Sequence, residues 1–194
     1  TLFRSVKIAK WLVPYTSEDI DFMEKASWFE MLASGIRDSF DDVFWNEDKG
    51  CYASFVVNGE LTNHFCKLTN ALALYAKLVP EDKIFAVADK LAYDDTLIDT
   101  SLSASIFKYE ALLMLGDTYA QFVFDQIGQK WGHMLYSGAT SFWETEKGAW
   151  DFDNAGSLCH GWSAVPLLLY YKYLLGVSPK TKGFEDYTFK PLRT

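Results

Sequence analysis

Basic residues are scarce in this sequence of 194 residues, which has 18 Lys and Arg against 26 Asp and Glu and a formal net charge of -8 at pH 7. Binding to a nucleic-acid backbone needs clustered Lys and Arg to neutralise phosphates, and no such cluster is present. No apolar run reaches the roughly 18 residues that a membrane-spanning helix requires, because Lys172 interrupts the nearest candidate, residues 164–177. The sequence therefore predicts neither nucleic acid nor a membrane as a partner.

Cysteine is also rare. Cys51, Cys66 and Cys159 form no C-x-x-C pair, and an odd number of cysteines in mostly apolar surroundings indicates buried free thiols rather than a structural disulfide. The sequence predicts no metal site and no cofactor. No signal-peptide pattern is present, and the first residue is Thr1 rather than Met, so we expect the sequence to be a piece of a longer protein.

Aromatic residues, by contrast, are abundant. They make up 17% of the chain, with 7 Trp, 11 Tyr and 15 Phe, against a charged fraction of 23%. This composition is typical of one densely packed domain and not of a disordered chain. Part of the aromatic excess could line a ligand cleft.

The spacing of apolar residues predicts helices along most of the chain. In residues 21–43 they recur on one helical face, at Phe22, Phe29, Leu32, Ala33, Ile36 and Phe40. Residues 44–61 contain Asn and Gly around a short apolar run, which predicts an extended hairpin or loop. Residues 2–13 are a further helical candidate.

Beyond residue 68, wholly apolar and amphipathic helical segments alternate. The predicted segments are 69–79, 80–92, 101–115, 117–131 and 157–177. Asp117 is predicted to cap the fourth of these after a break at Gly116, and Pro166 to kink the last. The alternation predicts a mainly helical fold that forms about half of an (α/α) six-hairpin toroid, in which shielded inner helices pair with outer helices that face water.

The end of the chain alternates apolar and polar residues from 184 to 192, through Tyr187 and Phe189, as a β-strand does. We therefore expect residues 1–183 to form the C-terminal half of the toroid. Residues 184–194 are expected to begin a truncated β-sandwich module.

The stretch that carries chemistry is residues 136–162, YSGATSFWETEKGAWDFDNAGSLCHGW. It combines small residues, aromatic residues, acids and a histidine in a predicted connection between helices, where ligand-binding residues concentrate. Trp143 offers a flat apolar platform for a sugar and Glu144 follows it directly, while His160 is predicted at a helix start where it could donate to a ligand hydroxyl. Asp151, Asp153 and Asn154 add acceptors, and Trp150 and Trp162 are further predicted sugar contacts. From the residues alone, a solvated loop acid at Glu144 and a structural histidine at position 160 stay open.

Three motifs make the chain similar to a known family: GATSFWE at 138–144, SLCHGWSA at 157–164 and YKYLLGV at 171–177. They resemble the end of the catalytic domain in α-L-rhamnosidases of glycoside hydrolase family 78. The runs FWNEDKGCY at 44–52 and TNALALYAKLVPEDK at 69–83 resemble the same family, in the same order. The resemblance covers most of the chain.

The resemblance implies an inverting glycoside hydrolase acting on terminal α-L-rhamnosyl residues or a similar deoxysugar. Glu144 aligns with the general base that activates water, His160 with a residue that hydrogen-bonds rhamnose, and Trp143 with the pocket wall. Inversion also needs a general acid about 6.5–9.5 Å from the base. Nothing in residues 1–50 resembles the family's acid motif, because its acids at 41, 42, 47 and 48 have the spacing of a helix end and a turn. The acid is expected upstream, and the isolated chain is expected to be inactive.

The sequence also departs from the family pattern. Leu68 stands where relatives often have a histidine, with His64 displaced upstream, and Glu146 replaces the second Trp of the usual W-E-x-W run. The fold is therefore better supported than rhamnose specificity. Two alternatives stay open: a carbohydrate-binding or structural helical module without turnover, and another toroid enzyme such as a polysaccharide lyase, which would need a Tyr, His or Arg acid and base.

The predicted partners are a carbohydrate substrate and the N-terminal half-barrel of the same polypeptide. Without that half, inner apolar helices would be uncovered, so the chain made alone is expected to form a homodimer or to aggregate.

Overall fold

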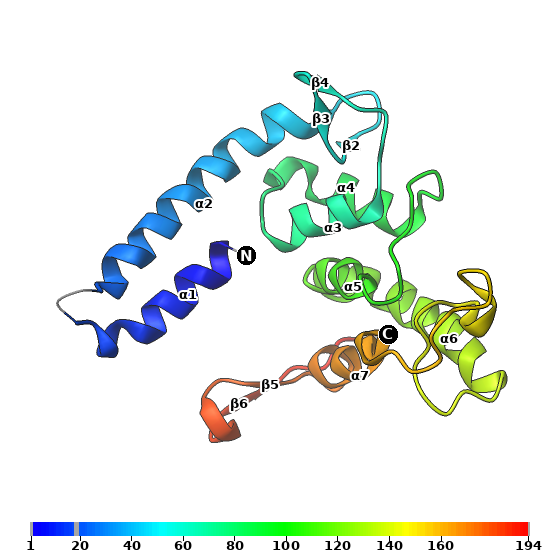
Figure 1. The fold of residues 1–194 in the computed structure, drawn as a ribbon. Helices are drawn as coiled ribbons and strands as arrows, with labels where there is room; N and C mark the ends of the chain where they lie inside the picture. Colours follow the sequence, from blue (N-terminus) through cyan, green and yellow to red (C-terminus); the bar gives the residue numbers. More distant parts are fainter. Residues whose placement is uncertain (1, 18–19, 194) are drawn as a thin grey trace.

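The computed structural model describes residues 2–17 and 20–193. Within that part of the chain, helices dominate the architecture (Figure 1). They are α1 (Leu2–Leu12), α2 (Phe22–Phe44), α3 (Lys67–Tyr75), α4 (Ile84–Tyr93), α5 (Ser105–Leu113), α6 (Ala120–Tyr136) and α7 (Val165–Leu169). The prediction of a mainly helical chain is confirmed.

Three short antiparallel hairpins connect or follow the helices. They pair β1 (Trp45–Asn46) with β2 (Cys51–Tyr52), β3 (Val56–Val57) with β4 (Glu60–Leu61), and β5 (Val177–Pro179) with β6 (Tyr187–Phe189). The first two confirm the hairpin predicted after α2. The strand predicted near the end of the chain is also present as β6, and its partner is β5.

The core lies where α5 packs against α3, α4, α6 and α7. Seven of the nine residues of α5 are buried, whereas α4 and α6 bury one face each. The buried face of α6 repeats every three or four residues, as an outer helix requires, through Ala120, Val123, Ile127, Trp131 and Met134. The predicted alternation of buried and amphipathic helices is therefore confirmed for α4 to α6, whereas α3, predicted to be buried nearly all round, leaves Leu72 exposed.

The hairpin of α1 and α2 stands beside this core (Figure 1). Helix α2 begins after Asp21, whose carboxylate accepts hydrogen bonds from the backbone N–H groups of Met23 (2.8 Å) and Glu24 (3.2 Å). Such an N-cap stabilises a helix by about 1 kcal/mol. The predicted apolar face is covered in part only, because Ile36 is exposed. Trp28 and Met31, which lie outside that face, are exposed as well.

The prediction of one buried helix over residues 157–177 is wrong. Regular helix is confined to α7, and one π-helical turn, η6 (Tyr170–Leu174), follows it. Pro166 occupies the first turn of α7, where its missing N–H costs nothing, so it starts this helix and does not kink it. His160 consequently lies in extended backbone ahead of a short 3-10 turn, η5 (Gly161–Ser163), and not at the start of a helix.

The predicted cap at Asp117 is also wrong. Asp117 lies inside a 3-10 turn, η3 (Gly116–Tyr119), and its carboxylate accepts a hydrogen bond from the backbone N–H of Arg193. No side chain caps α6, whose N-cap residue is Tyr119. Gly116 does separate two helical segments as predicted, with a φ of 82° that glycine adopts without strain.

The three cysteines are free thiols, as predicted, but only Cys51 is buried. Cys66 is partly exposed and caps α3 by accepting a hydrogen bond from the Thr69 N–H, and Cys159 is exposed. The expectation of three buried thiols is therefore wrong for Cys159, which lies in the loop before α7. None of the helices in the described residues is long and apolar enough to cross a membrane.

Candidate functional site

The candidate site is built on the long loop between α6 and α7, residues 137–164. Its two arms run antiparallel, because the Glu144 N–H donates to the Ser157 carbonyl (2.9 Å) and the His160 N–H donates to the Phe142 carbonyl (2.7 Å). The Ser141 hydroxyl adds a hydrogen bond to the Leu158 carbonyl. This pairing brings Glu144 and His160, 16 residues apart in the sequence, onto neighbouring extended segments.

The carboxylate of Glu144 is held by the opposite arm. Its Oε2 accepts a hydrogen bond from the backbone N–H of Ser157 at 3.3 Å, and the side chain is half-buried. A carboxylate tied to a backbone donor has fewer accessible rotamers than one free in solvent. Glu144 is therefore oriented by the fold of its own loop.

Trp143 packs inward. A Cβ placed on Gly148 would lie 2.7 Å from the Cε3 atom of the indole, and Gly148 has a φ of 57° that favours glycine. The ring of His133 approaches Trp143 edge-on, with the ring centroids 6.3 Å apart. One face of the Trp143 indole is thus committed to the loop, and the glycine is required for that contact.

Trp162 is 81% exposed and meets the ring of His160 in a T-shaped arrangement at 6.3 Å. Backbone hydrogen bonds pair the arms that carry Glu144 and His160, and Trp162 contacts His160 on its own arm. Trp150, which is 80% exposed, lies instead in the stretch between the arms.

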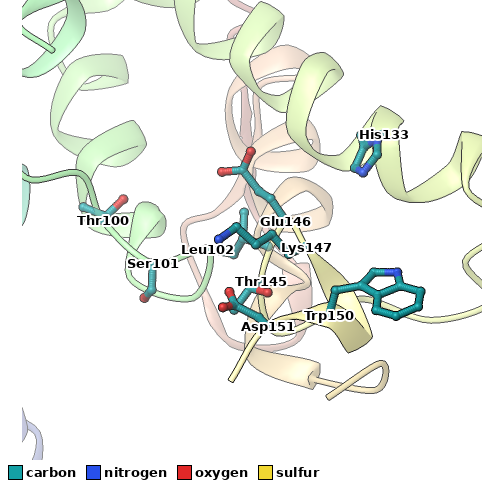
Figure 2. Close-up of a pocket in the computed structure, with 9 residues that line it drawn as sticks. All are labelled: Thr100, Ser101, Leu102, His133, Thr145, Glu146, Lys147, Trp150 and Asp151. Atoms are coloured by element: carbon teal, nitrogen blue, oxygen red, sulfur yellow. The ribbon is translucent and has the colours of Figure 1, made fainter. Parts of the chain in front are cut away.

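Beside the paired arms lies a cavity of about 720 Å³, and it is lined by Trp150, alone among the predicted catalytic and sugar-contact residues, and by Asp151, one of the predicted acceptors. Figure 2 shows the segment before α5 on one side of this cavity and Trp150 on the other, with Thr145 and Asp151 between them. The lining residues are Thr100, Ser101, Leu102, His133, Thr145, Glu146, Lys147, Trp150 and Asp151. The structure therefore divides the five predicted residues between two locations.

A network of ion pairs anchors the loop to α5 and α6. The ammonium of Lys130 lies 2.6 Å from Glu146 and 3.3 Å from Asp99, and the ammonium of Lys108 lies 2.7 Å from the other oxygen of Asp99. Glu146, where the resemblance implies a tryptophan, is therefore held in an ion pair.

Burial and ion pairing together shift the pKa values of the side chains in this network. Burial would raise the pKa of Asp99, but the hydrogen bond and charge of Lys108 outweigh it and lower that pKa to about 2. Burial lowers the pKa of Lys108, which is only 1% exposed, and Asp99 offsets this in part. For Lys130, the hydrogen bond to Glu146 and the charge of Asp99 overcome burial and raise the pKa. The pairing therefore favours the charged forms of Asp99 and Lys130.

Few features of the sequence indicate this network. Lys108 interrupts an apolar segment, which is a signal for a buried ion pair, but nothing in the sequence identifies Asp99 as its partner or shows that Lys130 also pairs with Asp99. The described residues contain no cluster of three or more His, Cys, Asp or Glu side chains that could hold a metal ion.

Comparison with known proteins matches this fold to one family. Residues 7–174 match the family model described as the bacterial alpha-L-rhamnosidase 6 hairpin glycosidase domain. No curated protein sequence matches the chain significantly.

Solved structures with the same fold include three rhamnosidases. The GH78-family rhamnosidase of Bacillus sp. GL1 is 24% identical, with a TM-score of 0.75 over 87% of this chain and 18% of its own. The Klebsiella oxytoca rhamnosidase with rhamnose bound is 18% identical, with a TM-score of 0.65 over 87% of this chain and 31% of its own. The Streptomyces avermitilis α-L-rhamnosidase complexed with L-rhamnose is 18% identical, with a TM-score of 0.67 over 98% of this chain and 18% of its own.

The chain thus spans less than a third of the length of each of these structures. The family match covers most of this chain, and the helical arrangement agrees with part of a six-hairpin domain. The chain belongs to the bacterial α-L-rhamnosidase six-hairpin glycosidase family.

Proposed function

We propose that this chain is the C-terminal half of the catalytic domain of an inverting glycoside hydrolase that removes terminal α-L-rhamnosyl, or closely similar deoxysugar, residues from glycans. The observation that supports this most is the pairing of the loop arms, which sets Glu144 and His160 on neighbouring segments. Two relatives of the same fold were solved with rhamnose bound. A terminal rhamnosyl residue is the substrate that fits these observations together.

In this proposal Glu144 is the general base. Its carboxylate removes a proton from a water molecule as that water attacks the anomeric carbon, on the face opposite the leaving oxygen. The hydrogen bond from the Ser157 N–H to Oε2 fixes the carboxylate, so Oε1 is the oxygen that accepts the proton of the water. His160 donates a hydrogen bond to a hydroxyl of the sugar.

The tryptophans supply apolar contact in this proposal. Trp162 adjoins His160, and Trp143 can present to a sugar only the face of its indole that Gly148 does not cover. Trp150 is the third proposed saccharide contact, at the rim of the separate cavity. Aromatic faces suit the apolar C–H surface of a sugar ring.

The general acid and the other half of the ring belong to a preceding part of a longer polypeptide. Apolar side chains exposed on α7 and just after it support this, because an inner helix needs cover on both sides; they are Leu167, Leu168, Tyr171 and Leu175. Residues 184–194 are proposed to begin the next, β-sandwich, module.

The direct test uses the longer polypeptide and an aryl α-L-rhamnoside. Replacing Glu144 by Ala is expected to lower the rate of hydrolysis at least about a hundredfold, because a general base contributes that much or more. Glu60→Gln, at an exposed position of β4, is the matched control and is expected to leave the rate unchanged. A rate for Glu144→Ala within twofold of the wild type would sink the assignment. If the wild type binds rhamnose without turnover, the chain is part of a binding module.

The proposed inversion also predicts the anomeric configuration of the first product. Proton NMR of the first product is expected to show β-L-rhamnose released from an α-L-rhamnoside. An initial α-product would indicate retention and would remove the water-activating role from Glu144.

The exposed apolar side chains also predict how the isolated chain associates. Water-exposed apolar surface costs roughly 25 cal/mol per Å², so the isolated 194-residue chain is expected to dimerise or aggregate and to be inactive. Light scattering that shows a clean monomer at high concentration would contradict this.

A further inference from the structure

Of the residues that line the cavity between the segment before α5 and the loop after α6, the catalytic proposal uses only Trp150. It has about 720 Å³ of space, within the range of small-molecule sites. Glu144, Trp143, His160 and Trp162 do not line it. Any ligand that it binds is therefore held by a different set of side chains.

Two buried hydroxyl groups in this cavity have no hydrogen-bond partner. Only five buried side-chain polar atoms in the described part of the chain lack a partner, and two of them are the Oγ1 atoms of Thr100 and Thr145. Both threonines line the cavity, from separate segments of the chain (Figure 2). Buried hydroxyls are nearly always hydrogen-bonded, because an unpaired one loses its interactions with water without compensation. Because the two oxygen atoms have almost no accessible surface, each threonine must turn about its Cα–Cβ bond to meet a ligand in the cavity. A ligand with hydroxyl groups would then satisfy both.

The charges around the cavity nearly cancel. The carboxylates of Glu146 and Asp151 line it together with the ammonium of Lys147. Glu146 is already neutralised by Lys130, at 2.6 Å. What remains is one carboxylate and one ammonium, so the cavity offers no net charge to attract a uronic acid or a phosphate.

At the rim, Trp150 presents a largely exposed indole. An exposed tryptophan beside polar groups offers a flat face to the C–H side of a pyranose ring while the sugar hydroxyls reach hydrogen-bonding groups. We propose that this cavity is a second saccharide-binding site, for a neutral sugar unit that stacks on Trp150 and hydrogen-bonds the hydroxyls of Thr100 and Thr145.

This site shares only Trp150 with the saccharide contacts proposed above, and binding there does not depend on hydrolysis at Glu144. The two segments that form it are held together by the ion pairs of Lys130 with Asp99 and Glu146. Thr100 follows Asp99 directly, and Thr145 precedes Glu146 directly. The same ion pairs therefore hold both threonines at the cavity.

The probe is cellobiose, a neutral disaccharide that contains no rhamnose, titrated into the longer polypeptide with ¹⁵N-labelled tryptophan. The chain has seven tryptophans, and the indole N–H signal of Trp150 is assigned from its loss in Trp150→Phe. Cellobiose at millimolar concentration is expected to shift the Trp150 signal saturably. The signal of Trp11, which is 75% exposed on α1, is expected to stay in place.

Variants then separate the contacts. Trp150→Ala is expected to weaken cellobiose binding at least about fivefold, and Thr100→Val and Thr145→Val about threefold each, since each removes one hydroxyl at constant shape. Trp11→Ala, a matched exposed tryptophan, is expected to bind like the wild type. Glucuronate, which carries a negative charge, is expected to bind no more tightly than glucose.

The proposal is overturned if cellobiose does not shift the Trp150 signal, or if it shifts Trp162 in its place. It is also overturned if both valine variants bind cellobiose as the wild type does while their amide spectra show an intact fold. Neither result affects the assignment of Glu144, because that assignment rests on rhamnoside hydrolysis and on residues outside this cavity.

Discussion

Replacing Asp99 by Asn tests whether the ion-pair network anchors the candidate loop. The pKa of Asp99 is lowered from its ordinary 3.8 to about 2, a difference that corresponds to about 2.4 kcal/mol at 1.36 kcal/mol per unit. Because 40% of the Asp99 side chain is exposed, solvent screening reduces this to about 1 kcal/mol. The variant also leaves the buried Lys108 ammonium without its counter-charge, which adds a cost. We expect the free energy of unfolding to fall by about 2 kcal/mol in total at pH 7.

The assay is urea unfolding followed by circular dichroism, with Asp42→Asn, at an exposed position of α2, as the control. Because the pKa of Asp99 is depressed in the folded chain, its stabilisation is complete above the ordinary pKa of 3.8. It disappears as the pH falls towards 2. The difference between Asp99→Asn and the wild type is therefore expected to shrink from pH 5 downwards. A loss below about 0.5 kcal/mol at pH 7, which is typical of a surface substitution, would refute the reasoning.

Two further substitutions test the packing. Gly148→Ala is expected to lower the free energy of unfolding by more than about 2 kcal/mol, because the new Cβ would meet the Trp143 ring and alanine resists a φ of 57°. Its control is Gly35→Ala, in open space on α2, which is expected to raise the free energy of unfolding by about 0.5–1 kcal/mol. Thermal unfolding with near-ultraviolet dichroism measures both, and equal effects would contradict the packing of Trp143. Leu91→Ala, at a fully buried position, is expected to cost about 2–5 kcal/mol, against less than about 1 kcal/mol for Leu72→Ala, where the side chain is 40% exposed. Urea unfolding that gives the two leucine variants the same stability would contradict the assigned core.

Helix periodicity predicted most of the fold, because a buried face repeats every three or four residues wherever a helix packs on a core. It predicted α2 nearly to the residue, including Asp21 at its start. It failed in residues 157–177, where a continuous apolar run looks the same whether it forms one helix or a loop followed by a short helix. Pro166 was the available signal. Proline is common in the first turn of a helix and disrupts a helix interior, so its position favoured a helix that starts there.

The candidate site was predicted in part. The sequence singled out the loop and its residues, but the pairing of its arms depends on hydrogen bonds between residues 13–18 positions apart, such as that of His160 with Phe142. It also grouped Trp150 with Glu144, whereas Trp150 lines a separate cavity with Thr100. Threonine hydroxyls have no distinctive spacing, so only the fold reveals that two of them are buried together.

Chemical rescue of the longer polypeptide tests the role of Glu144 most directly. In Glu144→Gly, hydrolysis of an aryl α-L-rhamnoside is expected to be at least about a hundredfold slower, and sodium azide is expected to restore turnover because azide needs no base. Azide nitrogen bonds to the anomeric carbon as the bond to the aglycone breaks and the general acid protonates the leaving oxygen, so the predicted product is β-L-rhamnosyl azide. The account would be contradicted if Glu144→Gly hydrolysed the rhamnoside at the wild-type rate without azide. It would also be contradicted if the variant formed no rhamnosyl azide when azide is present.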